Sequence, residues 1–252
     1  MDVSTEFLPG FDGARLTVHR LGEGRPVLML HGLFSSAEVN WIKYGTARRL
    51  AEAGFACVMP DWRAHGQSAK PHEPAAYPHD VLVKDLVALV GGLGLTDYDL
   101  AGFSLGSRTA LRGVISAGLA PRRLVLGGMG LSGLTGWSGR TEHFLHVIAR
   151  FGTIERGDPA YMAQNFMRST KVDLVATRLL LESFGGGAVE AFSAVTMPTL
   201  VVCGTDDHDN GSAEELVAAL PDARYAPIPG NHLTSVTMPE LAEAMVGFLQ
   251  AD

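Results

Sequence analysis

Features typical of secreted, membrane-spanning or disulfide-stabilised proteins are scarce in this sequence. Only two of its 252 residues are cysteines, Cys57 and Cys203, and each lies in an apolar, strand-like run. We therefore expect buried free thiols and a reducing, cytoplasmic compartment. No apolar run reaches the roughly 18 residues that a bilayer span requires. The N-terminal stretch MDVSTEFLPG lacks the basic start and the apolar block of a signal peptide.

Charge runs and cofactor motifs are equally scarce. The net charge is −7 and no run of lysine or arginine occurs, so we expect neither nucleic acid nor an anionic membrane as a partner. No glycine-rich segment matches a dinucleotide or phosphate-loop fingerprint, and we expect no cofactor. The acidic cluster 206–209 lacks the glycine and glutamate of a calcium loop, and His143 and His146 lack the further ligands of a zinc motif. We therefore expect no metal, and a small-molecule substrate is the predicted partner.

What the sequence does contain is an alternation of apolar runs and helical patterns. Arg15–Leu21 alternates polar and apolar residues, as a half-buried strand does. The Phe11-Asp12-Gly13 turn before it predicts an antiparallel pair at a sheet edge. Continuous apolar runs, typical of strands covered on both faces, follow at Pro26–Leu30, Ala56–Met59, Leu100–Phe103, Leu124–Leu126 and Thr199–Cys203. Helical patterns between them predict a mostly parallel, doubly wound α/β sheet flanked by helices at Tyr44–Ala53, Val81–Leu93 and Ser104–Ala117.

This alternation is interrupted by a long segment without convincing strands. Residues 131–190 contain helix-like pieces and many aromatic side chains, whereas linkers are poor in aromatics. We expect this segment to be a small helical cap inserted over the sheet. Residues 1–130 and 191–252 then form the core.

The last part of the chain returns to the core pattern. Ser212 opens a capping box for one helix. Ala223–Pro227 predicts a short strand, and Thr237 is a cap-like start for a final helix that ends near Gln250.

The clearest chemical signal is the Gly-x-Ser-x-Gly pattern around Ser104. The pattern stands where an apolar run passes into a helical one, which is typical of a nucleophile elbow. Glycines at positions 102 and 106 relieve crowding in such a turn, and the helix that follows directs its free N–H groups toward whatever lies beside Ser104. The plainer alternative is that Ser104 is only a helix N-cap.

Other polar residues follow the predicted strands, at the edge of the sheet where functional groups gather. His31 follows the first buried strand, Asp206 and Asp207 follow the strand at Thr199–Cys203, and His232 follows the last one. A serine needs a base within hydrogen-bond reach, and a histidine base needs a carboxylate to orient it. The chain order Ser, Asp, His is the one expected of this type of sheet.

With these motifs the chain resembles a serine-nucleophile member of the α/β-hydrolase superfamily. The resemblance covers most of the chain outside the insertion and is carried by His31-Gly32, Asp61–Ser68, Gly102–Gly106, Gly204–Asp207 and Gly230-Asn231-His232. It implies the α/β-hydrolase fold. Ser107 is a departure, because many relatives carry a second glycine there.

The resemblance also implies a role for each matching residue. Ser104 is expected to be the nucleophile, His232 the general base and Asp207 the orienting acid, with Asp206 as the alternative acid. The expected oxyanion hole consists of the backbone N–H groups of Leu105 and of Leu33, or of Phe34 in place of Leu33. His31 and the Asp61–Ser68 segment are expected to brace the loops through buried hydrogen bonds.

A serine at the elbow narrows the reaction class. The same scaffold hosts haloalkane dehalogenases and epoxide hydrolases when the elbow residue is aspartate, so serine disfavours both. Serine, histidine and an oxyanion hole suit attack on a carbonyl carbon with formation of an acyl-enzyme. We expect hydrolysis of a small to medium, mostly apolar carboxylic ester. The alternatives are a carbon–carbon bond hydrolase or cofactor-free peroxidase on the same triad, and a slow-turnover ligand-binding receptor of this fold. The residues expected to contact substrate are Phe34, Phe103 and Trp137.

Overall fold

The chain folds around one eight-stranded sheet, seen in the computed structural model that describes residues 1–184 and 191–251. The side chain of Trp137 also lies outside this description. The strand order is β1-β2-β4-β3-β5-β6-β7-β8. In chain order the strands are β1 (Ser4–Pro9), β2 (Arg15–Leu21), β3 (Arg25–Leu30), β4 (Phe55–Pro60), β5 (Asp99–Phe103), β6 (Leu124–Gly127), β7 (Thr199–Gly204) and β8 (Ala223–Ile228).

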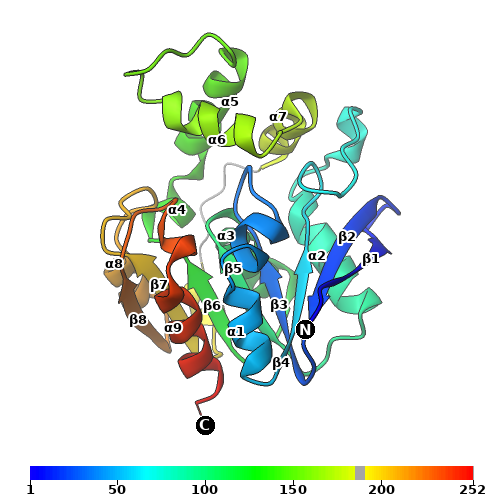
Figure 1. Cartoon of the computed structure of the whole chain (residues 1–252), viewed down its shortest axis with the longest axis vertical. Helices are drawn as coiled ribbons and strands as arrows, with labels where there is room; N and C mark the ends of the chain where they lie inside the picture. Colours follow the sequence, from blue (N-terminus) through cyan, green and yellow to red (C-terminus); the bar gives the residue numbers. More distant parts are fainter. Residues whose placement is uncertain (185–190, 252) are drawn as a thin grey trace.

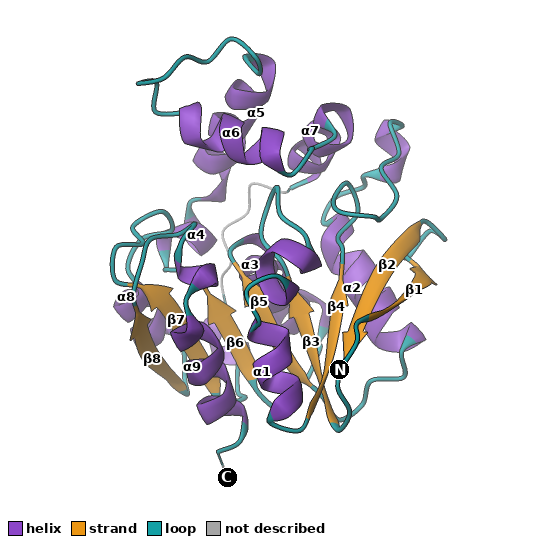
Figure 2. Cartoon of the chain, viewed as in Figure 1, coloured by secondary structure: helices purple, strands orange, loops and turns teal. Residues whose placement is uncertain are grey.

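The sheet is parallel except at one edge. β1 pairs with β2 and β2 with β4 in antiparallel fashion, as the alternating pattern and turn predict, and the other neighbouring strands are parallel. Figure 2 shows the strands as one twisted layer with helices in front of it and behind it. The carboxyl ends of β5, β7 and β8 therefore open toward the same edge of the sheet.

Helices cover both faces because the central strands are apolar on both sides. One face carries α2 (Val81–Gly92), α3 (Leu105–Ala117) and α8 (Ala213–Ala219), and the other carries α1 (Thr46–Glu52) and α9 (Pro239–Leu249). Within β3, Leu28 and Leu30 belong to the first core, and Val27 and Met29 to the second. The core helices thus confirm the predicted doubly wound arrangement.

Three longer helices lie above the carboxyl ends of the strands (Figure 1). They are α5 (Trp137–Ala149), α6 (Tyr161–Ser169) and α7 (Leu174–Ser183), preceded by the short α4 (Ser132–Thr135). They share a small apolar core of their own, in which Val147 and Met167 are fully buried. Phe34 from the loop after β3 joins this core and meets the ring of Phe144 edge-on, with centroids 5.0 Å apart.

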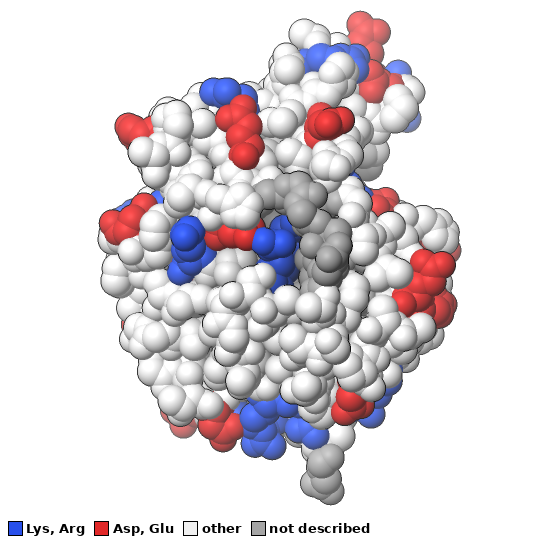
Figure 3. Space-filling model, turned by 180° about the vertical axis from the view of Figure 1, so that it is seen from behind, with Lys and Arg blue, Asp and Glu red and all other residues white. Residues whose placement is uncertain are grey.

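Short helical turns complete the chain. η1 (Glu38–Ile42) follows the loop after β3, and the others are η2 (Pro74–Ala76), η3 (Phe192–Ala194) and η4 (Ser235–Thr237). None of the helices in the described ranges is both long and apolar enough to cross a membrane. Seen from behind, basic and acidic side chains are interspersed on a mostly uncharged surface (Figure 3).

Two of the predicted helix starts differ in detail. Ser212 caps α8 by accepting a hydrogen bond from the Glu215 amide at 3.1 Å, and its hydroxyl donates to the Glu214 carboxylate, also at 3.1 Å. The last helix begins at Pro239, not at Thr237, because the Thr237 hydroxyl is bonded to the Thr234 carbonyl at 2.7 Å. Proline at the first helical position needs no amide partner and supplies the required φ.

Candidate active site

Ser104 sits on a tight turn between β5 and α3. Its φ is +52°, a conformation that side-chain-bearing residues adopt only where the surroundings enforce it. A Cβ on Gly102 would stand 2.3 Å from the Gly106 carbonyl carbon, and one on Gly106 would stand 2.0 Å from the Leu30 carbonyl oxygen. Only glycine fits at either end of the turn. The Ser104 side chain makes no cap hydrogen bond to α3, so the plain N-cap interpretation is wrong.

The departure at Ser107 fits this turn without disturbing it. Its hydroxyl donates to the Gly127 carbonyl of the neighbouring strand at 2.8 Å. The Ser104 amide donates to the same carbonyl, also at 2.8 Å. These two bonds tie the start of α3 to the end of β6.

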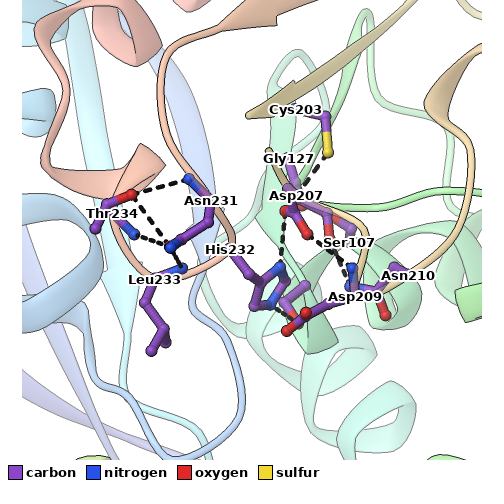
Figure 4. Close-up of polar contacts among 12 residues, drawn as sticks. Ser107, Gly127, Cys203, Asp207, Asp209, Asn210, Asn231, His232, Leu233 and Thr234 are labelled. Atoms are coloured by element: carbon purple, nitrogen blue, oxygen red, sulfur yellow. Dashed lines mark hydrogen bonds and ion pairs between the residues drawn. The ribbon is translucent and has the colours of Figure 1, made fainter. Parts of the chain in front are cut away.

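A chain of hydrogen bonds joins Ser104 to two residues from distant loops. His232, after β8, places Nε2 3.0 Å from Ser104 Oγ. Its Nδ1 lies 2.8 Å from Oδ2 of Asp207, which follows β7 (Figure 4). The three residues that the sequence places at separate strand ends thus converge on one point.

The carboxylate that completes this series of hydrogen bonds belongs to Asp207 rather than to Asp206. Asp206 is exposed, whereas Asp207 is 6% exposed and is held by the Asp209 amide and the Cys203 thiol, as Figure 4 shows. Burial disfavours its carboxylate, but the hydrogen bond and charge of His232 outweigh burial and hold the pKa of Asp207 below its ordinary value. Asp207 is therefore charged at neutral pH and can orient and stabilise a protonated His232.

Two backbone amides near Ser104 have different surroundings. The Phe34 amide donates to Nε2 of His65 at 3.0 Å, and Phe34 itself has a φ of +60°. Within residues 1–184 and 191–251, no hydrogen bond uses the Leu33 N–H. Of the two alternatives, the geometry therefore favours Leu33 as the partner of Leu105 in an oxyanion hole, since an oxyanion site needs N–H groups without another acceptor.

His31 and Asp61 brace the loops around Ser104. His31 is fully buried, donates from Nδ1 to the Gly32 carbonyl at 2.7 Å and accepts at Nε2 from the Trp62 amide at 2.9 Å. Burial lowers its pKa, so it stays neutral. Asp61 accepts from the Ala37 and Gln67 amides, each at 2.8 Å.

Arg63 braces a neighbouring part of the core. It makes a two-pronged ion pair with the buried Asp85 at 3.0 and 2.9 Å and a second one with Asp12 at 2.8 and 2.6 Å. No atom of this network reaches Ser104 in the contacts described, which agrees with a structural role.

Two cavities meet at Ser104. One has a volume of about 390 Å³ and the other about 600 Å³, and both are lined by Ser104, His232 and Leu33. Phe103 lines the smaller cavity and Phe34 the larger one, although no more than 4% of either residue is exposed. The expected contact of Trp137 with substrate falls outside the described side chains.

One buried polar residue of the smaller cavity has no counterpart among the sequence predictions. Asn40, on η1, accepts a hydrogen bond at Oδ1 from the Gly32 amide, 3.0 Å away. It thus fixes the backbone one residue before Leu33. Nothing in the local sequence indicates this contact, because an isolated asparagine in a polar-apolar stretch is typical of any surface turn.

One group of side chains has the composition of a metal site. Ligand atoms of Asp207, Asp209 and His232 lie within 4.8 Å of one another. Two of them, Asp207 Oδ2 and His232 Nδ1, already bond to each other at 2.8 Å. A metal ion here would have to displace the hydrogen bond that orients His232.

Comparison with known proteins shows which proteins the chain resembles. A family model described as the alpha/beta hydrolase fold matches residues 25–117. The AB hydrolase superfamily protein YisY of Bacillus subtilis is 35% identical over 97 residues, 38% of this chain and 34% of that protein. Epoxide hydrolase A of Mycobacterium tuberculosis is 37% identical over 95 residues, 37% of this chain and 29% of that protein. The 2-hydroxymuconate semialdehyde hydrolase of Pseudomonas sp. is 31% identical over 123 residues, 49% of this chain and 42% of that protein.

Solved structures share the whole fold at lower sequence identity. An esterase from Exiguobacterium antarcticum superposes with a TM-score of 0.81 over 98% of this chain and all of that chain, at 21% identity. A bromoperoxidase from Bacillus anthracis gives a TM-score of 0.70 with the same coverage, 98% and 100%, and 21% identity. The sequence matches span well under half the length of each curated relative. The sheet and these likenesses agree: the chain has the α/β-hydrolase fold, and residues 25–117 match the family model of that fold.

Proposed function

We propose that this protein is a serine hydrolase that cleaves small to medium, mostly apolar carboxylic esters through an acyl-enzyme. The observation that carries the proposal is the unbroken hydrogen-bond chain from Ser104 through His232 to the buried Asp207. A lone hydroxyl is a poor nucleophile at neutral pH, and this arrangement supplies the base it needs.

The geometry supports a two-step reaction. Ser104 Oγ attacks the ester carbonyl carbon while His232 Nε2 accepts its proton, and Asp207 holds His232 by Nδ1. The N–H groups of Leu33 and Leu105 stabilise the negative oxygen of the tetrahedral intermediate, to which one such donor contributes about 3–4 kcal/mol. His232 then gives its proton to the departing alkoxide. Water, activated by the same histidine, releases the acid from Ser104.

The serine itself argues against an epoxide hydrolase despite the sequence match to one. That match covers 37% of the chain, and epoxide hydrolysis on this scaffold uses an aspartate at the elbow, where this chain has Ser104. An ester is attacked at a carbonyl, whose developing oxyanion needs the amide donors beside Ser104.

We propose that the cap of residues 131–190 selects the substrate. From it, Phe144, Met162 and Phe166 contribute apolar surface to the larger cavity. Charges on that cavity are of both signs, since Arg140, Asp206 and Asp209 all belong to its lining. An uncharged ester suits such a lining better than an anion or a cation.

The first test is kinetic. We expect kcat/KM for p-nitrophenyl esters from acetate to decanoate to favour short and medium chains over a charged acyl group such as succinate. Ser104→Ala and His232→Ala should lose on the order of a million-fold in kcat, and Asp207→Asn on the order of ten thousand-fold. Asp206→Asn is the matched control and should retain most activity. A preference for succinate, or loss in Asp206→Asn but not in Asp207→Asn, would contradict the proposal.

A second reaction on the same triad has support in the comparisons. The longest of the three sequence matches is to 2-hydroxymuconate semialdehyde hydrolase. A diketone panel beside the ester panel separates the two reactions: faster turnover of diketones would assign carbon–carbon bond hydrolysis. Tight binding of esters without turnover would instead indicate a receptor.

A further inference from the structure

Asn40 is a buried residue that lines the cavity beside Ser104, and only the oxygen of its side-chain amide is hydrogen-bonded to the protein. The residue is 3% exposed and lines the smaller cavity together with Ser104. Its Oδ1 accepts from the Gly32 amide at 3.0 Å, which fixes how the amide group is turned. Within the described residues, the Nδ2 group has no hydrogen-bond partner, and it is not among the polar atoms that neighbouring residues close off.

The Nδ2 group therefore opens into the cavity and can donate to a molecule that binds there. A ligand that covered this donor without offering an acceptor would leave it unpaired, which is unfavourable. The cavity lining is mixed, with Val39 and Phe103 on the apolar side and Lys43 and Thr170 on the polar side. A hydrogen-bond donor in this position suits a ligand that carries an acceptor oxygen.

The distance between Asn40 and the nucleophile is short. Both adjoin Gly32: a Cβ built on that residue would lie 3.5 Å from Ser104 Cβ and 3.7 Å from Asn40 Oδ1. An acyl group attached to Ser104 and extending into the smaller cavity therefore reaches Asn40 after only a few bonds. The side chain is too close to the reacting centre to contact only the far end of a long substrate.

We propose that Asn40 is a specificity-determining residue, whose Nδ2 donates to an oxygen atom in the acyl part of the substrate. The inference rests on the proposed ester hydrolysis and specifies its substrate class: acyl groups with a keto, hydroxyl or ether oxygen a few atoms beyond the ester carbonyl. A site built to hydrogen-bond a substrate oxygen discriminates strongly against the analogue without it, because the buried amide is then left unpaired.

A matched pair of esters tests this. p-Nitrophenyl levulinate carries a keto group where p-nitrophenyl isocaproate carries a methyl branch, and the two acyl groups have the same number of heavy atoms. We expect kcat/KM to be higher for levulinate in the native protein. In Asn40→Leu the ratio of the two values should fall about tenfold, the effect of one hydrogen bond.

Two further variants separate recognition from loop positioning. Asn40→Asp keeps an acceptor for the Gly32 amide but removes the donor, and its ratio should fall as in Asn40→Leu. Ser35→Ala is the control: Ser35 lines the same cavity, but its hydroxyl is closed off by neighbouring residues, so the ratio should be unchanged. Equal losses for both esters in the Asn40 variants, or no levulinate preference in the native protein, would overturn the inference.

Equilibrium binding distinguishes this inference from the proposed reaction. Ser104→Ala protein cannot form an acyl-enzyme, yet it should bind methyl levulinate more tightly than methyl isocaproate by calorimetry, and Asn40→Leu should remove the difference. That result with no ester turnover in the native protein would retain the Asn40 site and reject ester hydrolysis. Ester turnover with equal Kd values for the two ligands would support ester hydrolysis and reject the Asn40 site.

Discussion

Nε2 of His65 accepts the hydrogen bond of the Phe34 amide, 3.0 Å away, and thereby removes that amide from competition for an oxyanion. Nδ1 of His65 donates to the Arg63 carbonyl at 3.0 Å, so both ring nitrogens are used. The contact holds Phe34 in its left-handed conformation, next to Leu33, which lines both cavities with Ser104. In the proposed mechanism, this contact leaves the Leu33 amide rather than the Phe34 amide for the oxyanion.

This contact predicts a graded loss of activity. In His65→Leu the Phe34 amide loses its acceptor, the Leu33 amide shifts, and kcat should fall by up to about 100-fold, the effect of displacing a reacting group by about 1 Å. His65→Gln offers an oxygen in place of Nε2 and should retain more activity. An unchanged kcat in folded His65→Leu protein would show that the contact does not position Leu33.

The elbow glycines make a stability prediction. In Gly106→Ala a methyl group would stand 2.0 Å from the Leu30 carbonyl oxygen, so backbone must move and the free energy of unfolding should fall by about 3 kcal/mol or more. Gly91→Ala is the control, because nothing lies within 4 Å of its Cβ and it lies in α2. That change should add about 0.5–1 kcal/mol. Urea unfolding measures both, and equal midpoints would refute the crowding argument.

The ion pairs of Arg63 lead to a second prediction about stability. Arg63→Met leaves the buried Asp85 without its partner, and loss of one member of a buried ion pair typically costs about 3–5 kcal/mol. Arg178→Ala, which breaks the exposed pair with Glu182, should change the unfolding free energy very little. A small effect of Arg63→Met would mean that Asp85 finds another partner or becomes protonated.

The buried histidines predict how stability depends on pH. Burial, together with the nearby His31, lowers the pKa of His65 to about 3 from an ordinary 6.5. Between these values the unfolded chain binds a proton that the folded chain does not, so stability must fall as pH decreases from about 6.5 to 3, by up to ~1.4 kcal/mol per pH unit. His65→Gln should reduce this slope in urea titrations at several pH values, whereas the exposed His79→Gln should leave it unchanged.

The sheet could be predicted from the sequence because its pattern is local. Arg15–Leu21 alternates and forms β2, although the predicted half-buried strand has five of its seven residues buried. Thr199–Cys203 is continuously apolar and lies in β7, buried on both faces. The Gly-x-Ser-x-Gly turn is recognisable from its local spacing, and the crowding at Gly102 arises within the turn, whereas Gly106 lies against the Leu30 carbonyl of β3. Thr237 shows the limit: its hydroxyl bonds backward to Thr234 and leaves the helix start to Pro239.

Contacts between distant segments could not be predicted in this way. The choice of Leu33 over Phe34 depends on His65, 31 residues further along the chain. The choice of Asp207 over Asp206 depends on which carboxylate turns toward the loop after β8. Asn40 acquires its position only when η1 folds back onto Gly32. Each of these three positions depends on how distant elements pack together, and the spacing of residues along a single sequence does not reveal that packing.

The most direct test of the account is covalent labelling of the nucleophile. Native protein and Ser104→Ala protein are treated with a small fluorophosphonate, and the adduct is located by peptide mass spectrometry. The account predicts a stoichiometric adduct on Ser104 and none in the variant. A folded native protein that remains unlabelled, or is labelled at another residue, would contradict an activated Ser104.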